Sequence, residues 1–245
     1  MAEILYKGID VSHHNGTIDW KAVKNAGNVQ FAILRAGYGK SISQKDKQFE
    51  NNYAGCKLNE IPCGAYWYSY AVSADEALEE AKTCLDIIKG RRFEYPILFD
   101  IEESSQVKLG KDICSEICRT FCDYLEQNGY FSGIYTFDSF ANTNLLESVK
   151  NRYTMAVARV DSNPPKYSPY DIWQYSWKGK INGISGDVDM DYCYRDFNVI
   201  KDNGLNGFEA PVKDTDNINL KYDVNGDGKV TSEDALAILN NVVGK

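Results

Sequence analysis

Short runs of β-branched and aromatic residues alternate along this chain with segments of helical periodicity, and this alternation limits the possible folds. The strand-like runs cover residues 8–12, 29–36, 62–71, 95–102, 131–137, 153–160 and 171–176, with a shorter run near Val188. Helical patterns cover residues 20–25, 46–58, 74–89 and 111–128. A helix between two strands provides the crossover that a parallel pair needs. The pattern therefore predicts an α/β fold built on a parallel sheet.

Carboxylates stand at the ends of three strand-like runs. They are Asp10, the pair Asp100 and Glu102, and the alternating Asp187, Asp189 and Asp191. In a closed barrel the C-terminal ends of parallel strands meet at one rim, where such side chains would form an active site. The chain has no Gly-rich phosphate loop, and its connections after Phe137 are short and poorly helical. We therefore predict an irregular, TIM-like (β/α) barrel with fewer helices than strands.

The segment Asp100-Ile101-Glu102 carries the strongest chemical signal in the chain. Side chains at positions i and i+2 of a strand share a face and lie roughly 7 Å apart. Like charges at this separation raise one pKa, and a protonated acid beside an ionised carboxylate is the pair that glycoside hydrolysis requires. A lone D-x-E motif is more often a solvated acidic turn. The two further acidic segments favour the catalytic interpretation.

Several motifs resemble those of glycoside hydrolase family 25, the lysozymes that cleave the β-1,4 bond between N-acetylmuramic acid and N-acetylglucosamine in peptidoglycan. They occur in the family's order over residues 8 to about 195: G-I-D-V-S-H-H-N-G-T-I-D-W (8–20), F-A-I-L-R-A-G (31–37), C-G-A-Y-W-Y-S-Y (63–70), P-I-L-F-D-I-E (96–102), G-I-Y-T (133–136), I-W-Q-Y-S (172–176) and G-D-V-D-M-D (186–191). The resemblance implies an irregular barrel of eight strands with few helices. It assigns residues 1–207 to the catalytic domain.

The same resemblance assigns roles to four acids. It implies that Glu102 is the general acid, with Asp100 as its partner and Asp10 and Asp189 as further carboxylates of the site. A substrate with a 2-acetamido group can supply the amide oxygen as nucleophile, so a protein carboxylate need only orient that group. We expect Asp100 to take this role, with Asp10 as a competitor. No cofactor is expected for catalysis.

Asp189 also has a structural interpretation, because acid clusters can serve to fix a loop or a neighbouring side chain. Its neighbours Asp187 and Asp191 are expected to face solvent. The family often has an amide side chain at the position of Asp191, so this residue departs from the pattern. Arg35 follows an apolar strand and is expected to pair with one of the acids, in a structural or a catalytic role.

Aromatic side chains are expected to form the walls of a sugar site. Tyr66, Tyr68 and Tyr70 alternate on one strand and share a face, while Trp67 points to the opposite side. We favour Tyr66 and Tyr68 as groove residues over pure packing, because a large ring with a polar tip suits a half-wet wall. The resemblance adds further groove positions, which are Tyr135, Trp173, Gln174 and Tyr175.

The adjacent histidines His13 and His14 do not predict a metal site. Their side chains point in different directions, and the chain has no third histidine. Loop hydrogen bonding near Asp10 is the better interpretation.

Composition and targeting signals restrict the other functions. The chain has 35 acidic and 27 basic residues and a formal net charge of −8, which argues against nucleic acids or acidic membranes as main partners. No segment reaches the length of about 18 apolar residues that a membrane span needs. No signal peptide is visible before the first strand-like run. The resemblance nevertheless implies a secreted or cell-wall-associated enzyme.

The chain has seven cysteines, an odd number, so they cannot all form disulfides with one another. Three of them recur every four residues beside an apolar stripe, which places thiols on the buried side of one helix as small apolar residues. The thiols are Cys114, Cys118 and Cys122, and the stripe is Ile113, Ile117, Phe121 and Leu125. A disulfide framework is therefore not expected, and a reducing setting explains the thiols more easily.

A polar stretch that contains Pro211 predicts a linker over residues 208–220. Beyond it, residues 223–234 follow the spacing of a calcium-binding loop, with oxygen ligands at positions 1, 3, 5, 7 and 12 and a glycine at position 6. The predicted ligands are Asp223, Asn225, Asp227, the carbonyl of Lys229, and Asp234. Calcium at this loop would be structural.

The C-terminal segment 221–245 resembles one repeat of a dockerin, because the twelfth loop position is Asp and an apolar helical stripe follows it. Dockerins attach glycoside hydrolases to cohesin-bearing scaffolds, and they usually carry two repeats. Only one repeat is visible here, so a cohesin-type scaffold stands beside three alternatives: a truncated repeat, a divergent repeat and a helix that docks on its own barrel.

The sequence thus predicts a secreted peptidoglycan muramidase with a calcium-binding C-terminal segment. A glycosidase that acts on another N-acetylated glycan, such as chitin, is the alternative enzyme. A catalytically silent module that binds cell walls is the alternative from another class of protein. The four intact acids weigh against this last interpretation.

Overall fold

The computed structural model describes residues 3–161 and 163–210 of the chain, together with the single residues 223, 224, 226, 231, 232, 234 and 238. The chain divides into two compact units, Met1–Glu209 and Ala210–Lys245. The first unit contains all the strands and helices named below. Within the described residues, no helix combines the length and the apolar character that crossing a bilayer requires.

Eight strands close into a barrel in the order in which they occur in the chain. They are β1 (Tyr6–Val11), β2 (Phe31–Tyr38), β3 (Cys63–Tyr68), β4 (Ile97–Asp100), β5 (Ser132–Phe137), β6 (Thr154–Ala158), β7 (Ile172–Gly179) and β8 (Val188–Cys193). Strands β1 to β7 pair in parallel, and β8 is antiparallel to both β7 and β1. The predicted barrel is confirmed, but the expectation of fewer helices than strands is wrong, because the described part of the chain contains eight α-helices beside these eight strands. Because β8 is reversed, its first residues lie at the rim where the other strands end.

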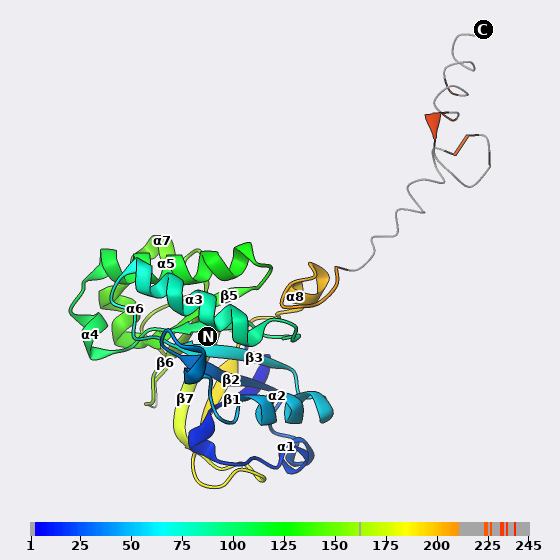
Figure 1. Ribbon diagram of the computed structural model, residues 1–245. Helices are drawn as coiled ribbons and strands as arrows, with labels where there is room; N and C mark the ends of the chain where they lie inside the picture. The colour runs from blue at the N-terminus through cyan, green and yellow to red at the C-terminus, as the bar shows by residue number, and fades with distance from the viewer. Residues whose placement is uncertain are drawn as a thin grey trace. The chain divides into compact units, whose positions relative to one another are not determined.

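Helices cover the outside of the barrel and are concentrated in the first half of the chain (Figure 1). The four predicted helices are confirmed as α1 (Trp20–Ala26), α2 (Phe49–Leu58), α3 (Ala74–Ile88) and α5 (Lys111–Gln127). Short helical segments that the sequence did not predict are η1 (His13–Asn15), η2 (Ile42–Gln44), α4 (Ser104–Val107), α6 (Asp138–Asn144), α7 (Glu147–Lys150) and α8 (Val199–Asp202). Helices α3 and α5 pack against each other on one side of the barrel (Figure 1).

The main core lies between the barrel wall and these helices. Helix α5 buries one stripe against it, formed by Cys114, Ile117, Cys118, Phe121, Cys122 and Leu125. Ile113 was expected on the same stripe, but it lies at the first turn of α5 and is 42% exposed. All seven cysteines are buried free thiols.

A second apolar cluster fills the lower interior of the barrel. Its members include Phe31, Ile33, Leu98 and Ile172, which project inward from different strands. Gly8 makes room for this packing, because a Cβ atom there would lie 2.4 Å from the Phe31 ring. The cluster forms an apolar floor below the rim.

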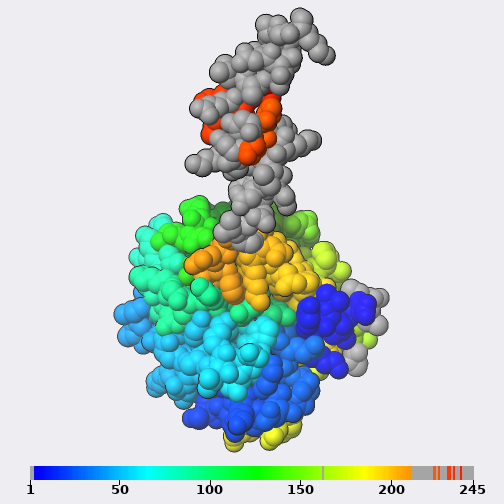
Figure 2. Space-filling view, turned by 90° about the vertical axis from the view of Figure 1, so that its right-hand side faces the viewer, coloured from blue at the N-terminus to red at the C-terminus, as the bar shows by residue number. Residues whose placement is uncertain are grey.

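The two ends of the barrel sequence meet where β1 pairs with β8. Figure 2 shows the N-terminal residues, in dark blue, beside the late part of the unit in yellow and orange. The backbone N–H of Leu5 donates a hydrogen bond to the carbonyl of Cys193 over 2.9 Å. This pairing closes the barrel and brings Asp10 opposite Asp189.

Candidate active site

A cavity of about 500 Å³ opens at the rim of the barrel. Alternate residues of the strands line it, because side chains along a strand point to opposite faces with a period of two. The strand residues in its wall are Asp10, Ile33, Arg35, Tyr66, Tyr68, Leu98, Asp100, Tyr135, Phe137, Ala156, Ile172, Gln174, Trp177, Asp189 and Asp191. Glu102, which follows β4, also lines it. The structure thus brings together all four acids that the sequence singled out.

Glu102 lies just beyond the C-terminal end of β4 and is partly buried. Burial raises the pKa of its carboxyl to about 7, and the negative charges of Glu103 and Asp189 add to the effect. A carboxyl group with this pKa keeps its proton near neutral pH, as an acid catalyst must. Glu102 therefore has the electrostatic environment of a general acid.

Asp100 is the last residue of β4 and is almost completely buried. Burial raises the pKa of Asp100 well above its ordinary value, and Glu102 and Asp10 raise it further. Its Oδ1 atom has no hydrogen-bond partner among the residues that the structure describes. A buried acceptor that faces a cavity can be satisfied by an N–H group of a ligand.

Asp10 is held by a hydrogen bond from a neighbouring amide. Nε2 of Gln174 donates to its Oδ2 atom over 2.7 Å. The same amide accepts at Oε1 from the hydroxyl of Tyr135 over 2.9 Å and from Nε1 of Trp177 over 2.7 Å. Burial raises the pKa of Asp10 to about 8, the charge of Asp189 contributes, and the Gln174 bond opposes the rise. Gln174 therefore holds Asp10 in position and links it to Tyr135 and Trp177.

The three carboxylates Asp187, Asp189 and Asp191 of the segment around β8 differ in how deeply they are buried. Burial raises the pKa of Asp189 to about 6. Asp187 is half-exposed and pairs with Lys180 over 2.6 Å, whereas Asp191 is only 3% exposed. The expectation that Asp191 faces solvent is therefore wrong. Because β8 runs antiparallel from the rim into the barrel, each step of two residues carries the inward face deeper.

Arg35 lines the cavity but does not pair with any of the four acids. Its Nε atom donates to Oδ2 of Asp46 over 2.8 Å, and the backbone N–H and Nδ1 of His13 lie 3.1 Å and 2.8 Å from the same oxygen. Burial alone would raise the pKa of Asp46, but bonds from His13, Gln48 and Arg35 hold it below its ordinary value. The sequence reasoning missed Asp46, which no motif marked.

The predicted aromatic positions separate into two groups. Tyr66, Tyr68 and Tyr135 line the cavity, as expected. Trp173 does not, since Ile172 and Gln174 take the inward positions of β7. Its Nε1 atom instead donates to the carbonyl of Arg159 over 2.9 Å. The structure therefore corrects the prediction that Trp173 lines the groove, because the alternation of β7 turns this side chain away from the cavity.

Trp177 takes the place in the wall that was expected of Trp173. It is 47% exposed, and its ring lies edge-on to Phe137 with the ring centroids 6.4 Å apart. The strand-like pattern ended at Ser176, but β7 continues to Gly179 through irregular pairing with β8. These irregularities shift the inward face and bring Trp177 to the cavity.

Gln106 is a second residue that the sequence reasoning missed. It is fully buried, and its Oε1 atom accepts the backbone N–H groups of Glu102 and Glu103 over 3.1 Å and 2.9 Å. Its Nε2 atom donates to the carbonyls of Ser69 and Ala71 over 3.3 Å and 3.1 Å. Gln106 thus ties the segment that carries Glu102 to the end of β3.

The predicted calcium loop lies in the second unit, where only part of it is described. The Asp234 carboxylate accepts the backbone N–H groups of Val224 over 2.9 Å and Thr231 over 2.7 Å. Asp223 accepts the N–H of Gly226 over 2.7 Å. These bonds bring the twelfth position of the loop to its beginning. The other predicted ligands lie outside the described residues, namely Asn225, Asp227 and Lys229.

The chain is similar to known proteins over the barrel. The family model of glycosyl hydrolases family 25 matches residues 9–184. The autolytic lysozyme of Clostridium acetobutylicum is 32% identical over 187 residues, which cover 76% of this chain and 55% of that protein. This chain therefore spans about half the length of that relative.

Two solved structures share the fold. The bacterial lysozyme of Streptomyces coelicolor aligns with a TM-score of 0.71 and 27% identity, over 80% of this chain and 96% of its own. The modular autolysin LytC of Streptococcus pneumoniae, in complex with a synthetic peptidoglycan ligand, aligns with a TM-score of 0.69 and 28% identity, over 77% of this chain and 46% of its own. The match to the family model covers most of the barrel and three of the four acids, Asp10, Asp100 and Glu102. This chain belongs to glycosyl hydrolases family 25.

Proposed function

We propose that the protein is a muramidase that hydrolyses the β-1,4 bond between N-acetylmuramic acid and N-acetylglucosamine in peptidoglycan. One observation carries the proposal: a carboxyl with a pKa of about 7, Glu102, lies in the same cavity as Asp100, a buried carboxyl with an unpartnered oxygen. The lysozyme names of two relatives and the peptidoglycan ligand of a third agree with it.

Glu102 acts first as general acid. Its proton passes to the glycosidic oxygen as the bond to the anomeric carbon breaks, so that the leaving sugar departs as a neutral alcohol. The acetamido oxygen of the substrate attacks the anomeric carbon and forms a cyclic intermediate. Glu102, now ionised, then removes a proton from water, which opens the intermediate with overall retention of configuration.

Asp100 orients the acetamido group in this scheme. Its free Oδ1 atom can accept the amide N–H and direct the amide oxygen toward the anomeric carbon. Asp10 is the weaker candidate for this role, because its Oδ2 atom already accepts a hydrogen bond from Gln174. Asp189, with a pKa of about 6, supplies negative charge near the positive charge that develops in the transition state.

Analysis of the products of purified peptidoglycan tests the proposal. After digestion and reduction of the new ends with borohydride, muramitol would support cleavage on the reducing side of muramic acid. Glucosaminitol would overturn the choice of bond, and cleavage of chitin oligosaccharides at a similar rate would favour the wider glycosidase. Binding to cell walls without release of any reducing end would show a silent binding module.

We also propose that the C-terminal unit binds one calcium ion. The spacing of the loop supports this, and so does the position of the Asp234 carboxylate next to the start of the loop. The proposed ligands are Asp223, Asn225, Asp227, the carbonyl of Lys229, and Asp234. A cohesin-type scaffold is the proposed partner of this unit, and an extracellular or cell-wall location follows from the proposed substrate.

A further inference from the structure

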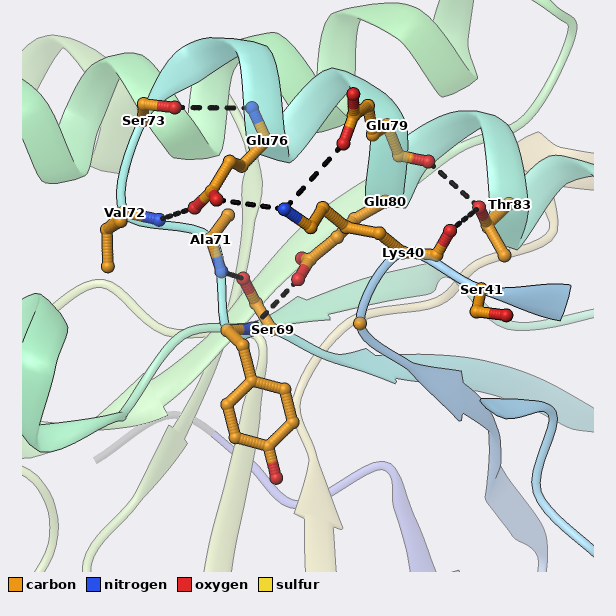
Figure 3. Close-up of polar contacts among 12 residues, drawn as sticks. Lys40, Ser41, Ser69, Ala71, Val72, Ser73, Glu76, Glu79, Glu80 and Thr83 are labelled. Carbon is orange, nitrogen blue, oxygen red and sulfur yellow. Dashed lines mark hydrogen bonds and ion pairs between the residues drawn. The ribbon is translucent and has the colours of Figure 1, made fainter. Parts of the chain in front are cut away.

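A second cavity, of about 510 Å³, opens where β3 leads into α3. Its walls come from the loop after β2 with Lys40, from Tyr70, and from α3 with Glu76 and Glu80. Figure 3 shows Lys40 extending across this region toward α3, with the Glu80 carboxyl beside its stem. None of these residues belongs to the wall of the first cavity.

Two packed aromatic rings join the walls of the two cavities. Tyr68 lines the first cavity and Tyr70 lines the second, and their rings pack edge-on with centroids 5.2 Å apart. Tyr70 also packs edge-on against Tyr38, at 6.1 Å. Tyr70 is 49% exposed, so part of this aromatic wall is open to solvent.

Glu80 is an unusual group for such a wall. It is fully buried, and its Oε1 atom accepts the backbone N–H of Tyr70 over 2.9 Å. Its Oε2 atom has no hydrogen-bond partner among the described residues. A buried oxygen without a partner destabilises the folded protein, so a group that binds it in the functional state would explain its presence.

The lysine at the cavity does not supply this partner. Nζ of Lys40 lies 2.9 Å from Glu76 and 3.8 Å from Glu79, and no ion pair joins it to Glu80. Two glutamates of α3, Glu76 and Glu80, thus line this cavity with one lysine, and Glu76 is the one that pairs with it (Figure 3). The remaining negative charge favours a cation.

The proposed substrate carries a group of this kind near the cleaved bond. Peptidoglycan bears peptide branches on its muramic acid residues, and a branch must leave the cavity in which the glycan is cut. A diamino acid in such a branch ends in a primary ammonium group. The packed rings of Tyr68 and Tyr70 join the walls of the two cavities, so a branch of a sugar bound in the first can extend along them toward the second.

We propose that the second cavity binds the primary ammonium group of a peptide branch of peptidoglycan, with the Glu80 carboxylate as its counter-ion and Tyr70 as its wall. The inference rests on the proposed function, since it names a further part of the same substrate. Glu80 binds substrate here and takes no part in bond cleavage.

The titration of Glu80 gives an independent signature of this binding. Burial raises the pKa of Glu80 to about 7, with Glu76 adding to the rise and bonds from Ser69 and Tyr70 and the charge of Lys40 opposing it. A bound ammonium group stabilises the ionised carboxylate and lowers this pKa. Binding therefore strengthens as the pH rises through about 7, while the ammonium itself stays charged.

Calorimetric titration of the full chain with a synthetic stem tetrapeptide blocked at its N-terminus, N-acetyl-L-alanyl-γ-D-glutamyl-L-lysyl-D-alanine, tests the binding directly, because the lysine side chain then carries its one ammonium group. The same peptide acetylated on the lysine side chain should bind about tenfold more weakly, because it lacks a charge-assisted hydrogen bond. Equal affinity of the two peptides at pH 8 would overturn the proposal. This comparison needs no variant protein.

Two matched variants locate the effect. Glu80→Gln keeps an oxygen to accept the Tyr70 N–H but removes the charge, and should weaken binding of the amine peptide about tenfold. Glu79→Gln removes the same charge from the next residue, which does not line the cavity, and should leave the affinity within about twofold. Equal losses in the two variants would show a general effect of charge and contradict a site at Glu80.

Hydrolysis assays distinguish failure of the ammonium site from failure of the proposed muramidase activity. Glycan strands freed of peptide by an amidase test cleavage alone. If they are cut, and amine-bearing strands show the same kcat/KM as acetylated ones, the second cavity has no role in substrate binding and the muramidase proposal stands. If no strand is cut but the amine peptide still binds at Glu80, the muramidase proposal fails and the ammonium site remains.

Discussion

Glu102 and Asp100 lie two residues apart, but their surroundings differ. Asp100 closes a strand inside the barrel, whereas Glu102 stands at the rim, where a glycosidic oxygen can reach it. Replacement of Glu102 by Gln should lower kcat by about 10²–10⁴-fold, because the amide cannot donate the proton. Assays with purified peptidoglycan measure the change, and thermal unfolding should show an intact fold.

The exposed helix residue Glu116 provides the control. Glu116→Gln changes the same charge at an exposed position of α5 that does not line the cavity, and should keep wild-type turnover. Near wild-type hydrolysis by Glu102→Gln would remove Glu102 from the role of acid.

Asp100→Asn should also reduce turnover strongly. An amide at this position can present its own N–H groups to the acetamido N–H, so the acetamido group is held less well and attack by its oxygen becomes slower. In the wild-type enzyme, NMR of the first product should show the β-configuration, as retention requires. Inverted product would show that water activated by a carboxylate, and not the acetamido oxygen of the substrate, attacks the anomeric carbon.

The raised pKa of Glu102 predicts how activity depends on pH. The acid must be protonated for the first step, so kcat/KM should fall as the pH rises through about 7. A rate profile from pH 5 to 9 measures this limb. A profile that stays flat through pH 8 would contradict the assignment.

The same shift predicts a change in stability. Burial raises the pKa of Glu102 from 4.5 to about 7, so the folded state binds this proton more tightly than the unfolded chain. Its contribution to the free energy of unfolding is complete below about pH 4.5 and is lost as the pH rises to about 7. Glu102→Gln should therefore become more stable relative to wild type over this range, as urea unfolding at pH 5 and pH 8 would show.

At the scale of elements, the active site depends on how β4 leads into α4. Gln106 in α4 accepts two backbone N–H groups there and donates to the end of β3. Gln106→Ala would leave buried backbone donors unpaired, so we expect a loss of about 1–3 kcal/mol in unfolding free energy. It should also lower kcat more than it changes KM, because Glu102 would be less well positioned.

The solvent-exposed Gln127→Ala, at the end of α5, is the matched control and should change neither quantity. If Gln106→Ala lowers stability but leaves kcat at the wild-type value, Gln106 supports the fold without positioning the acid.

At the scale of the whole molecule, the chain consists of a barrel unit with the acids and a C-terminal unit with the proposed calcium loop. Removal of calcium should loosen residues 221–245, since so short a segment depends on the ion for its order. Hydrolysis should continue, because all the acids of the cavity belong to the barrel unit. Calorimetric titration of chelated protein with calcium, beside a hydrolysis assay with and without chelator, measures both effects.

Absence of calcium uptake would refute the loop assignment. Loss of hydrolysis on chelation would show that the C-terminal unit supports the barrel.

The sequence by itself determined the strands, the helices that alternate with them in the first half of the chain, and the residues that share a face. These follow from local periodicity, which also identified Asp10, Asp100, Glu102 and Tyr66 as residues of one site. The family motifs made the barrel and the site predictable together, because they place the acids at strand ends.

The tertiary structure alone decided the direction of β8 and everything that depends on it. The reversed strand buries Asp191, and irregular pairing with β7 brings Trp177, and not Trp173, to the cavity. The partner of Arg35 and the position of Gln106 were likewise beyond the sequence. Local patterns specify which side chains share a face, whereas barrel closure and long-range hydrogen bonds determine where each face points and which groups meet there.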